Sequence, residues 1–267
     1  MEALIPNGHR RPARLRRNIA PEPETASDSN ARPLLMPYFA AMSQHLGPMR
    51  WWPARTPFEV IVGAILTQST SWGNVERAIA NLRSAHLLTP SAILAARMSR
   101  LAALVRPSGY FRQKAKKLKS FVRFLQREFG GSLKRMFDLP TAILREKLLS
   151  VHGIGPETAD SILLYAGKHA VFVVDAYTHR IFGRHGITNG EPEYESVRAL
   201  VEAALPRDSQ LFNEFHALVV TTGKNWCRKT KPRCAECPLG TLLPENSPLS
   251  QIRATDPHGS LSEQMVS

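Results

Sequence analysis

Residues 148–160 read Leu-Leu-Ser-Val-His-Gly-Ile-Gly-Pro-Glu-Thr-Ala-Asp and predict a tight turn between two helices. The stretch from Arg145 to Val151 can end the first helix, and the two glycines permit a turn with exposed backbone amides. Pro156 suits the first position of the second helix, where its missing N–H needs no partner. Amides that converge on a helix N-terminus attract anions. The residues predicted to bind a phosphate in this way are His152, Gly153, Ile154 and Gly155.

A carboxylate follows this hairpin. After the helix that begins at Pro156, the apolar run 171–174 presents Asp175 at the expected N-cap of another helix, 18 positions past Glu157. This order resembles the helix-hairpin-helix DNA glycosylases, in which the catalytic aspartate follows the hairpin in the same way.

Three further motifs resemble endonuclease III and its relatives. They are Gly-Tyr-Phe-Arg-Gln-Lys-Ala at 109–115, Leu-Thr-Gln-Ser-Thr at 66–70 and Lys-Pro-Arg-Cys-Ala-Glu-Cys-Pro at 231–238. The likeness covers roughly residues 34 to 240, and four motifs at compatible spacing are far more specific than one Gly-x-Gly turn. The resemblance implies two helical domains that flank a DNA cleft, and a base-excision-repair glycosylase that acts on a damaged base flipped from the duplex.

Helical periodicity points to the same fold class. Nearly every segment between the two ends of the chain has apolar residues at three- and four-residue spacing, separated by Gly, Pro and Ser. The sequence therefore predicts an all-α protein. The predicted helices span Phe58–Leu66, Val75–Leu88, Ser91–Leu104, Lys114–Phe129, Thr141–Val151, Pro156–Ala166, Ala176–Phe182, Glu193–Leu205 and Leu211–Gly223.

Four regions are expected along the chain. By resemblance, residues 57–168 form a six-helix barrel that contains the hairpin, and residues 34–56 combine with 169–243 into a second helical domain with a cysteine-containing loop. Residues 1–33 are rich in arginine and poor in large apolar residues, which predicts a disordered basic arm. Residues 244–267 are predicted to form a polar tail.

Charge and hydropathy narrow the class of partner. The chain has 267 residues and a net charge of +13, which favours a polyanion such as nucleic acid over an acidic membrane surface. No apolar run approaches the about 18 residues needed to span a bilayer. We expect a monomer that binds double-stranded DNA containing a damaged base, with no membrane partner, in the cytoplasm with the nucleoid.

Asp175 has a plausible chemical role. Breaking an N-glycosidic bond builds positive charge on the sugar, which an ionised carboxylate beneath that carbon stabilises while it orients or deprotonates water. The alternative is an ordinary N-cap, for which Asp is among the best residues. The two roles are compatible, because N-cap geometry helps keep the carboxylate ionised.

Glu157 departs from endonuclease III. Bifunctional members have a lysine at this position, whose amine forms a Schiff base with the sugar and permits strand cleavage. A glutamate cannot form a Schiff base. The sequence therefore predicts a monofunctional glycosylase unless Lys168 or Lys224 reaches the sugar. Glu157 is a candidate for activating water, or it simply complements the helix dipole. Two alternatives stay open: a bifunctional lyase that acts on oxidised pyrimidines, and a DNA-binding relative without catalysis.

The hairpin, together with Trp51-Trp52-Pro53 upstream, is most similar to the 3-methyladenine DNA glycosylase III type, in which an aromatic pocket accepts alkylated purines. A cationic purine can be held between aromatic faces by stacking and cation–π attraction, and it leaves readily without a general acid. Trp52, Pro53 and Trp72 are the pocket candidates. Ordinary core packing is the alternative for both tryptophans.

The three cysteines match only part of the endonuclease III iron-sulfur loop. Cys227, Cys234 and Cys237 have the spacing of its first three ligands, but Leu243 stands at the fourth. Three interpretations remain: a cluster with an unusual fourth ligand, a zinc site completed by a distant histidine, or an empty loop retained for DNA contact. No cofactor is expected to be required for the chemistry, and we expect little or no intact four-iron cluster.

Two further positions lie in segments expected to face DNA. Gln68 matches the glutamine that enters the base stack in endonuclease III-like proteins, and its alternative is a polar residue at a helix end. His179 and His216 are expected to line the cleft as structural residues. Lys224, near the end of the His216 helix, is a third catalytic candidate beside Asp175 and Glu157.

Overall fold

The computed structural model describes residues 32–49, 54–245 and 247. Within these ranges every regular element is helical and no strand occurs, which confirms the all-α prediction. No helix among the same residues is long and apolar enough to cross a membrane. The predicted basic arm and polar tail lie largely outside these ranges and stay predictions.

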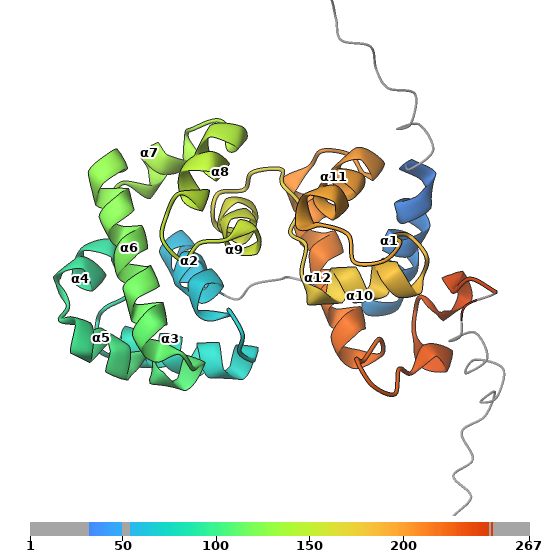
Figure 1. Cartoon of the computed structure of the whole chain (residues 1–267), viewed down its shortest axis with the longest axis horizontal. Coiled ribbons are helices and arrows are strands. Elements are labelled where there is room, and N and C mark those ends of the chain that lie inside the picture. Colours follow the sequence, from blue (N-terminus) through green and yellow to red (C-terminus); the bar gives the residue numbers. More distant parts are fainter. Residues whose placement is uncertain (1–31, 50–53, 246, 248–267) are drawn as a thin grey trace, which may run out of the picture.

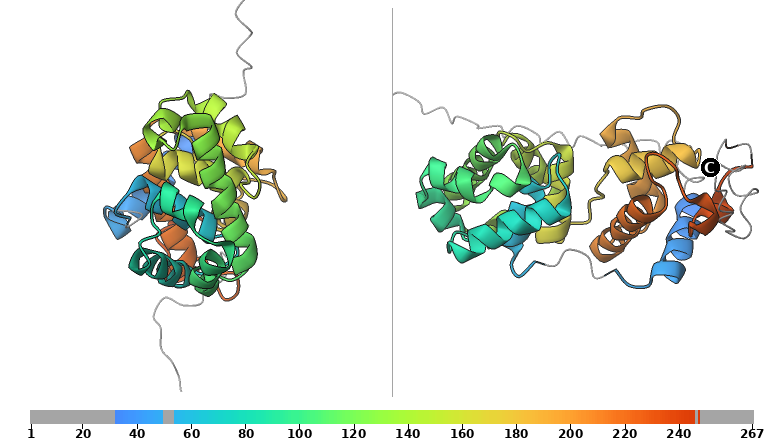
Figure 2. Two further views of the ribbon diagram at one scale, coloured as in Figure 1. Left: turned by 90° about the vertical axis from the view of Figure 1, so that its left-hand side faces the viewer. Right: turned by 90° about the horizontal axis from the view of Figure 1, so that it is seen from below.

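The helices are arranged in two lobes (Figure 1), and the right-hand view of Figure 2 shows the same separation from below. The first lobe contains α2 (Pro57–Leu66), α3 (Trp72–Ser84), α4 (Pro90–Ala95), α5 (Met98–Leu104), η1 (Arg106–Ser108), α6 (Phe111–Phe129), α7 (Leu133–Phe137), α8 (Thr141–Leu149), α9 (Pro156–Ser161) and η2 (Ile162–Ala166). The second contains α1 (Arg32–Leu46), α10 (Ala176–Arg184), α11 (Tyr194–Ala204), α12 (Ser209–Asn225), η3 (Cys234–Glu236) and η4 (Gly240–Leu242). The second lobe thus combines the two ends of the described chain.

Helix α2 forms the centre of the first lobe. Thr56 caps its N-terminus by accepting a hydrogen bond from the Glu59 amide (3.2 Å), and nearly all of its side chains are buried. At the other end the buried Lys114 of α6 donates to the carbonyls of Leu66 (2.9 Å) and Ser108 (2.5 Å). Two carbonyls without helical partners are thereby satisfied. This lysine therefore fixes the end of α2, from which the loop containing Gln68 departs.

The helix predicted over Ser91–Leu104 is in fact two helices. Ala96 and Arg97 are extended between α4 and α5, with ψ angles of 141° and 139°. The ammonium group of Lys119 donates to the carbonyls of Leu94 (2.7 Å) and Ala96 (2.5 Å). Lys119 therefore supplies, from α6, the hydrogen bonds that a continued helix would have made.

Other helix limits also differ from the sequence expectation. Helix α3 ends at Ser84, because His86 takes a left-handed conformation (φ 57°) and the Leu87 amide turns back to the Leu82 carbonyl (2.8 Å). The helix that begins at Pro156 continues through one π turn, η2. Helices α1 and α7 were not predicted.

In the second lobe, α1 packs against α11 and α12, and α10 crosses α12. The crossing is close at Gly223, where an added Cβ would lie 2.5 Å from Cδ1 of Tyr177. Phe172, Phe212 and Phe215 are fully buried in this lobe. Gly223 therefore allows α10, and Asp175 at its start, to lie directly against α12.

An extended segment joins η2 to α10, and side chains of α11 hold it. The Glu202 carboxylate accepts from the Phe172 amide (3.0 Å), and the Tyr194 hydroxyl accepts from the Val174 amide (3.4 Å). Two alternate amides of a strand-like segment are thus satisfied by side chains rather than by another strand. The residue that follows them is Asp175.

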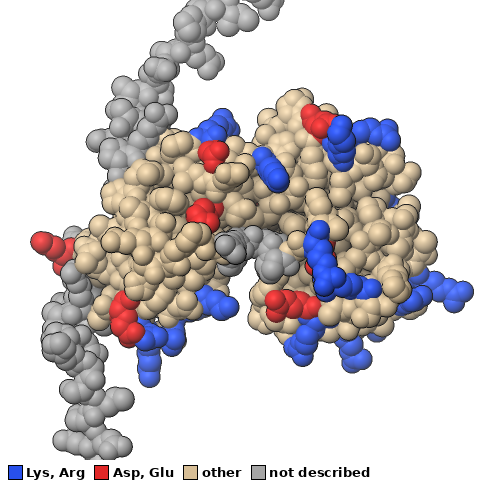
Figure 3. Space-filling model, turned by 180° about the vertical axis from the view of Figure 1, so that it is seen from behind, with Lys and Arg blue, Asp and Glu red and all other residues tan. Residues whose placement is uncertain are grey.

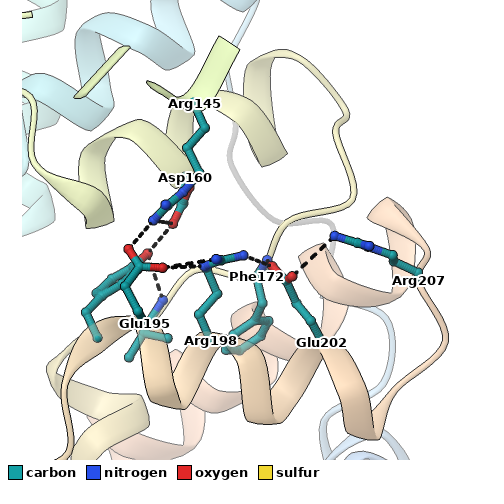
Figure 4. A network of polar contacts seen from close by, with 9 residues as sticks. Arg145, Asp160, Phe172, Glu195, Arg198, Glu202 and Arg207 are labelled. Atoms are coloured by element: carbon teal, nitrogen blue, oxygen red, sulfur yellow. Dashed lines mark hydrogen bonds and ion pairs between the residues drawn. The ribbon is translucent and has the colours of Figure 1, made fainter. Parts of the chain in front are cut away.

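Helix α11 contacts the first lobe at the buried carboxylate of Asp160 (Figure 4). Asp160 of α9 is completely buried and accepts from Arg145 Nε (2.7 Å), Arg145 Nη2 (3.0 Å) and the Tyr194 hydroxyl (2.9 Å). Arg145 also donates to Glu195 (2.6 Å). Burial raises the pKa of Tyr194 above its ordinary value, so its phenol stays protonated and can donate. The hairpin helix, α11 and the segment before Asp175 therefore share one polar network.

Candidate active site

The hairpin has the geometry that its sequence predicts. Helix α8 ends at Leu149, Gly153 has a φ of +83° that favours glycine, and Pro156 opens α9. Ile154 is buried (4% exposed) and anchors the turn in the core. Among the described residues the amides of Gly153 and Gly155 have no hydrogen-bond acceptor. They are available to an external anion.

Gln68 and Lys117 lie against this hairpin. Gln68 Nε2 donates to the Gly153 carbonyl (3.1 Å) and to Thr158 Oγ1 (2.9 Å), and Lys117 Nζ donates to Gln68 Oε1. A Cβ at Gly153 would lie 2.4 Å from Cγ of Lys117. The predicted base-stack residue is thus tied to the predicted phosphate site. Sequence reasoning missed Lys117; its position, one turn after the buried Lys114 of α6, is the signal that could have indicated it.

Asp175 caps α10 with only one of its oxygens. Oδ1 accepts from the amides of Tyr177 (3.0 Å) and Thr178 (2.8 Å) and from Thr178 Oγ1 (2.9 Å), and the hydroxyl completes a capping box. Oδ2 lies 3.8 Å from Nε2 of His216. The carboxylate is therefore held by its cap while its second oxygen makes no hydrogen bond to any residue the structure describes.

Glu157, in the first turn of α9, interacts electrostatically with Asp175. The residue is exposed to solvent, yet desolvation by the surrounding protein and the charge of Asp175 raise its pKa to about 7. The two lobes therefore bring together two carboxyl groups whose positions the sequence predicts, one from each lobe. A carboxyl group whose pKa is raised to near neutrality is typical of sites that handle a proton.

The lysines considered for a Schiff base are not tied to this pair. Lys168, in a left-handed conformation (φ 57°), and Lys224, in the last turn of α12, are both exposed. No hydrogen bond or ion pair joins either lysine to Asp175 or Glu157 in the described part of the chain. His152 is also exposed, at the turn of the hairpin.

His216 is more closely involved than its sequence position indicated. It lies on α12, its Nδ1 hydrogen-bonds the Tyr165 hydroxyl, and its Nε2 points toward Asp175. Burial lowers the pKa of this imidazole below its ordinary value, although the charge of Asp175 opposes the shift. His216 is therefore neutral near pH 7.

The proposed base pocket is described only in part. Trp52 and Pro53 lie outside the described residues. Trp72 begins α3, where its indole Nε1 donates to Glu76 (2.8 Å) and its ring packs against the core. The roles of all three residues in base binding stay predictions.

The three cysteines line one cavity, between α10 and the C-terminal loop. Cys227 and Cys234 are buried and Cys237 is half-buried. Leu243 and His185 lie in the same wall, and His185 Nδ1 is 3.3 Å from the Leu242 carbonyl oxygen. His185 is a residue that sequence reasoning missed, because it follows the end of α10, far from the cysteines in sequence.

The donor groups of this cavity do not fit a four-cysteine iron-sulfur cluster. Leu243, at the fourth ligand position, offers no metal donor. Across residues 32–49, 54–245 and 247, no three His, Cys, Asp or Glu side chains are arranged to hold a metal ion.

The loop is held instead by the protein's own contacts. Arg184 of α10 donates to Cys227 Sγ (3.3 Å) and to the carbonyls of Arg228 (2.7 Å) and Lys229 (3.0 Å). Gly240 allows close approach, because a Cβ there would lie 2.4 Å from the Cys234 carbonyl oxygen. These contacts hold the loop against α10.

Basic side chains occur on both lobes. On the face opposite to that of Figure 1, Lys and Arg side chains stand on each lobe, and a hollow separates the lobes along the lower edge (Figure 3). With a net charge of +13, this distribution suits a polyanion that contacts both lobes.

Comparisons with known proteins agree with this geometry. Residues 62–207 match the family model of the HhH-GPD superfamily of base excision DNA repair proteins. A proposed DNA repair glycosylase of Methanocaldococcus jannaschii is 46% identical over 202 residues, which cover 75% of this chain and 91% of that protein. Endonuclease III of Thermotoga maritima is 31% identical over 181 residues, 68% of this chain and 79% of that protein.

Two solved structures have a similar fold. The 3-methyladenine DNA glycosylase of H. pylori, bound to 1,N6-ethenoadenine, has a TM-score of 0.62 and 29% identity, and the match covers 73% of this chain and 96% of that one. An endonuclease III in a non-covalent DNA complex has a TM-score of 0.69 at 20% identity, over 80% and 95% of the two chains, and shows the shared fold. The chain therefore belongs to the HhH-GPD superfamily of base excision DNA repair proteins, as a DNA glycosylase with the endonuclease III-like fold.

Proposed function

We propose that this protein is a monofunctional glycosylase that hydrolyses the N-glycosidic bond of an alkylated purine flipped out of double-stranded DNA. The observation that carries the proposal is the pair of Glu157 and Asp175. A carboxyl group stands on the hairpin helix where bifunctional relatives have a lysine, and it interacts with the carboxylate at the start of α10.

The chemistry follows from these two groups. As the glycosidic bond breaks, the departing base takes the bonding electron pair and C1′ of the sugar becomes cationic. The free oxygen of Asp175 stabilises that charge. Water then adds to C1′ and loses a proton, and Glu157, with a pKa of about 7, is suited to receive it near neutral pH.

DNA binding is assigned to the hairpin. The amides of Gly153 and Gly155 would bind one backbone phosphate, an interaction that positions the duplex without reading its sequence. Gln68 would leave its hydrogen bonds to Gly153 and Thr158 in order to fill the gap left by the flipped base. Lys117 would then be free to contact the same phosphate.

An alkylated purine is the substrate that the sequence and one comparison favour together. A purine methylated at N3 carries positive charge and leaves without protonation, so two carboxyl groups suffice for its release. The H. pylori enzyme that shares 29% of its sequence with this chain was solved with ethenoadenine. Trp52, Pro53 and Trp72 are proposed to stack against the base. The monomeric state and the nucleoid location also stay predictions.

A panel of duplexes tests the substrate and the reaction type together. Each duplex contains one lesion: 3-methyladenine, ethenoadenine, uracil, an oxidised pyrimidine or a G·T mismatch. We expect base release from the alkylated duplexes, with a strand that breaks only after alkali or heat and no borohydride-trapped complex. Strand nicking through a trappable imine would establish the lyase alternative, and Lys168→Met and Lys224→Met would then identify its amine.

A further inference from the structure

One ring nitrogen of His216 is buried beside Asp175. The residue is only 6% exposed, and its Nε2 has no partner among the residues that the structure describes. Its ring is fixed on the other side by the Tyr165 hydroxyl at Nδ1, and it stands edge-on to the Phe172 ring, with centroids 5.9 Å apart. Such an atom costs stability, so its presence needs an explanation.

The neighbouring carboxylate lacks a hydrogen bond at the matching place. Oδ1 of Asp175 accepts three hydrogen bonds, whereas Oδ2 lies 3.8 Å from His216 Nε2. A shift of about 1 Å would bring the two atoms to hydrogen-bond distance. The unpartnered nitrogen and the unpartnered oxygen therefore face one another.

Charge selects the tautomer of this histidine. If Nδ1 carried the hydrogen, the lone pair of Nε2 would face an anionic oxygen and be repelled by it. If Tyr165 donates its hydroxyl hydrogen to Nδ1, the hydrogen of the neutral imidazole is on Nε2 and points at Asp175. The second arrangement satisfies all three side chains.

We propose that His216, held by Tyr165 as its Nε2–H tautomer, is a positioning residue that donates a hydrogen bond to the free oxygen of Asp175 in the DNA-bound enzyme. This inference rests on the proposed function of Asp175. The neutral imidazole orients the carboxylate beneath C1′ of the sugar without cancelling its charge. A histidinium would instead form an ion pair with it and weaken its hold on the sugar cation.

Three substitutions separate this role from simple packing. His216→Met keeps the volume but has no donor, His216→Gln restores an N–H near the position of Nε2, and Tyr165→Phe removes only the hydroxyl. In single-turnover base release on the duplex that the wild type cleaves best, we expect His216→Met to be slower by about tenfold to a hundredfold. Tyr165→Phe should be slowed less, His216→Gln should recover most of the rate, and duplex affinity should change little. An unimpaired His216→Met or Tyr165→Phe rate would overturn the proposal.

A spectroscopic measurement on the unmodified protein does not depend on how the variants fold. Histidine labelled with ¹³C and ¹⁵N distinguishes the two tautomers by NMR, and the signal of His216 is assigned by its loss in His216→Gln. We expect the Nε2–H form, and the Nδ1–H form would refute the inference. The Asp175→Asn variant distinguishes a failure of the role of His216 from a failure of the proposed function. If Asp175→Asn is inactive while His216→Met and Tyr165→Phe are normal, only the role of His216 fails. If Asp175→Asn is itself fully active, the proposed function fails.

Discussion

Glu157 and Asp175 are both carboxyl groups near a helix N-terminus, but the fold treats them differently. Asp175 accepts three hydrogen bonds through one oxygen, as the cap of α10. Desolvation by the surrounding protein and, to a smaller extent, the charge of Asp175 raise the pKa of Glu157 to about 7. Glu157 is thus suited to exchange a proton near neutral pH, while Asp175 is fixed in place by its cap.

The raised pKa of Glu157 predicts that this residue makes the stability of the protein depend on pH. Its pKa in the folded protein, about 7, is above the ordinary 4.5, so the folded state binds the proton more tightly than the unfolded chain. Ionisation of Glu157 therefore lowers the free energy of unfolding. The loss begins near pH 4.5, grows as the pH rises and is complete above pH 7. Calorimetric Tm values should show Glu157→Gln gaining on the wild type between pH 4.5 and pH 8. The exposed Glu146→Gln on α8 is the control, and an equal pH trend in both variants would contradict the assignment.

At the scale of elements, the hairpin offers a clean test of phosphate binding at Gly155. A Cβ there meets nothing within 4 Å and φ is −94°, so a side chain fits the fold but projects into the proposed phosphate site. Gly155→Leu should weaken binding to damaged and undamaged duplex alike, by about tenfold, in fluorescence anisotropy. Gly153 is unsuitable for this test, because its φ of +83° and Lys117 make any substitution disruptive. Unchanged affinity in a folded Gly155→Leu protein would exclude the phosphate site.

Helix α11 is predicted to position Asp175 through the segment that precedes it. Tyr194→Phe removes the acceptor of the Val174 amide and the donor to Asp160. We expect a loss of about 1–3 kcal/mol in urea unfolding, because a buried carboxylate loses a hydrogen bond. Base release should slow while duplex affinity is retained. Tyr110→Phe, on a side chain 73% exposed, should match the wild type in both measurements. A Tyr194→Phe protein with normal stability and rate would show that α11 has no such role.

The cysteine loop is predicted to carry little or no four-iron cluster. Leu243 supplies no fourth ligand, and Arg184 already binds the loop through Cys227 Sγ and two carbonyls. Protein purified without oxygen should contain far fewer than four irons per chain, with little visible absorbance, when iron, sulfide and zinc are quantified. About four irons with matching sulfide would contradict this prediction, and one zinc per chain would favour the zinc interpretation.

Local sequence signals predicted the elements that local chemistry fixes. The glycines and Pro156 define the hairpin, and Asp175 with Thr178 forms a capping box, so both could be placed without tertiary information. The break between α4 and α5 could not, because the lysine that stabilises it comes from α6. Sequence periodicity cannot reveal such a distant donor.

The same limit applies to the candidate site. Glu157 and Asp175 were found from their order along the chain. The contacts of His216 with Tyr165 and Asp175 depend on how α12 packs against η2 and α10, and no local motif encodes them. Sequence therefore predicted the groups proposed to act on the sugar, but not the side chains that surround them.

At the scale of the whole molecule, the proposed chemistry depends on the placement of two lobes. Glu157 belongs to the first lobe and Asp175 to the second (Figure 1). The polar network of Arg145, Asp160, Tyr194 and Glu195 joins them beside the connecting segment (Figure 4). Because each carboxyl group is fixed within its own lobe, the distance between them is set by this junction.

The most direct test of the account is single-turnover base release by Asp175→Asn. Asparagine is as good an N-cap as aspartate, so α10 should remain intact while the charge is lost. Asp208→Asn is the matched control, because Asp208 also caps a helix by accepting the Leu211 amide (2.7 Å). We expect Asp175→Asn to slow base release about a hundredfold or more, roughly 3 kcal/mol, with duplex binding retained or strengthened and Asp208→Asn unaffected. Release by Asp175→Asn at the wild-type rate would contradict it.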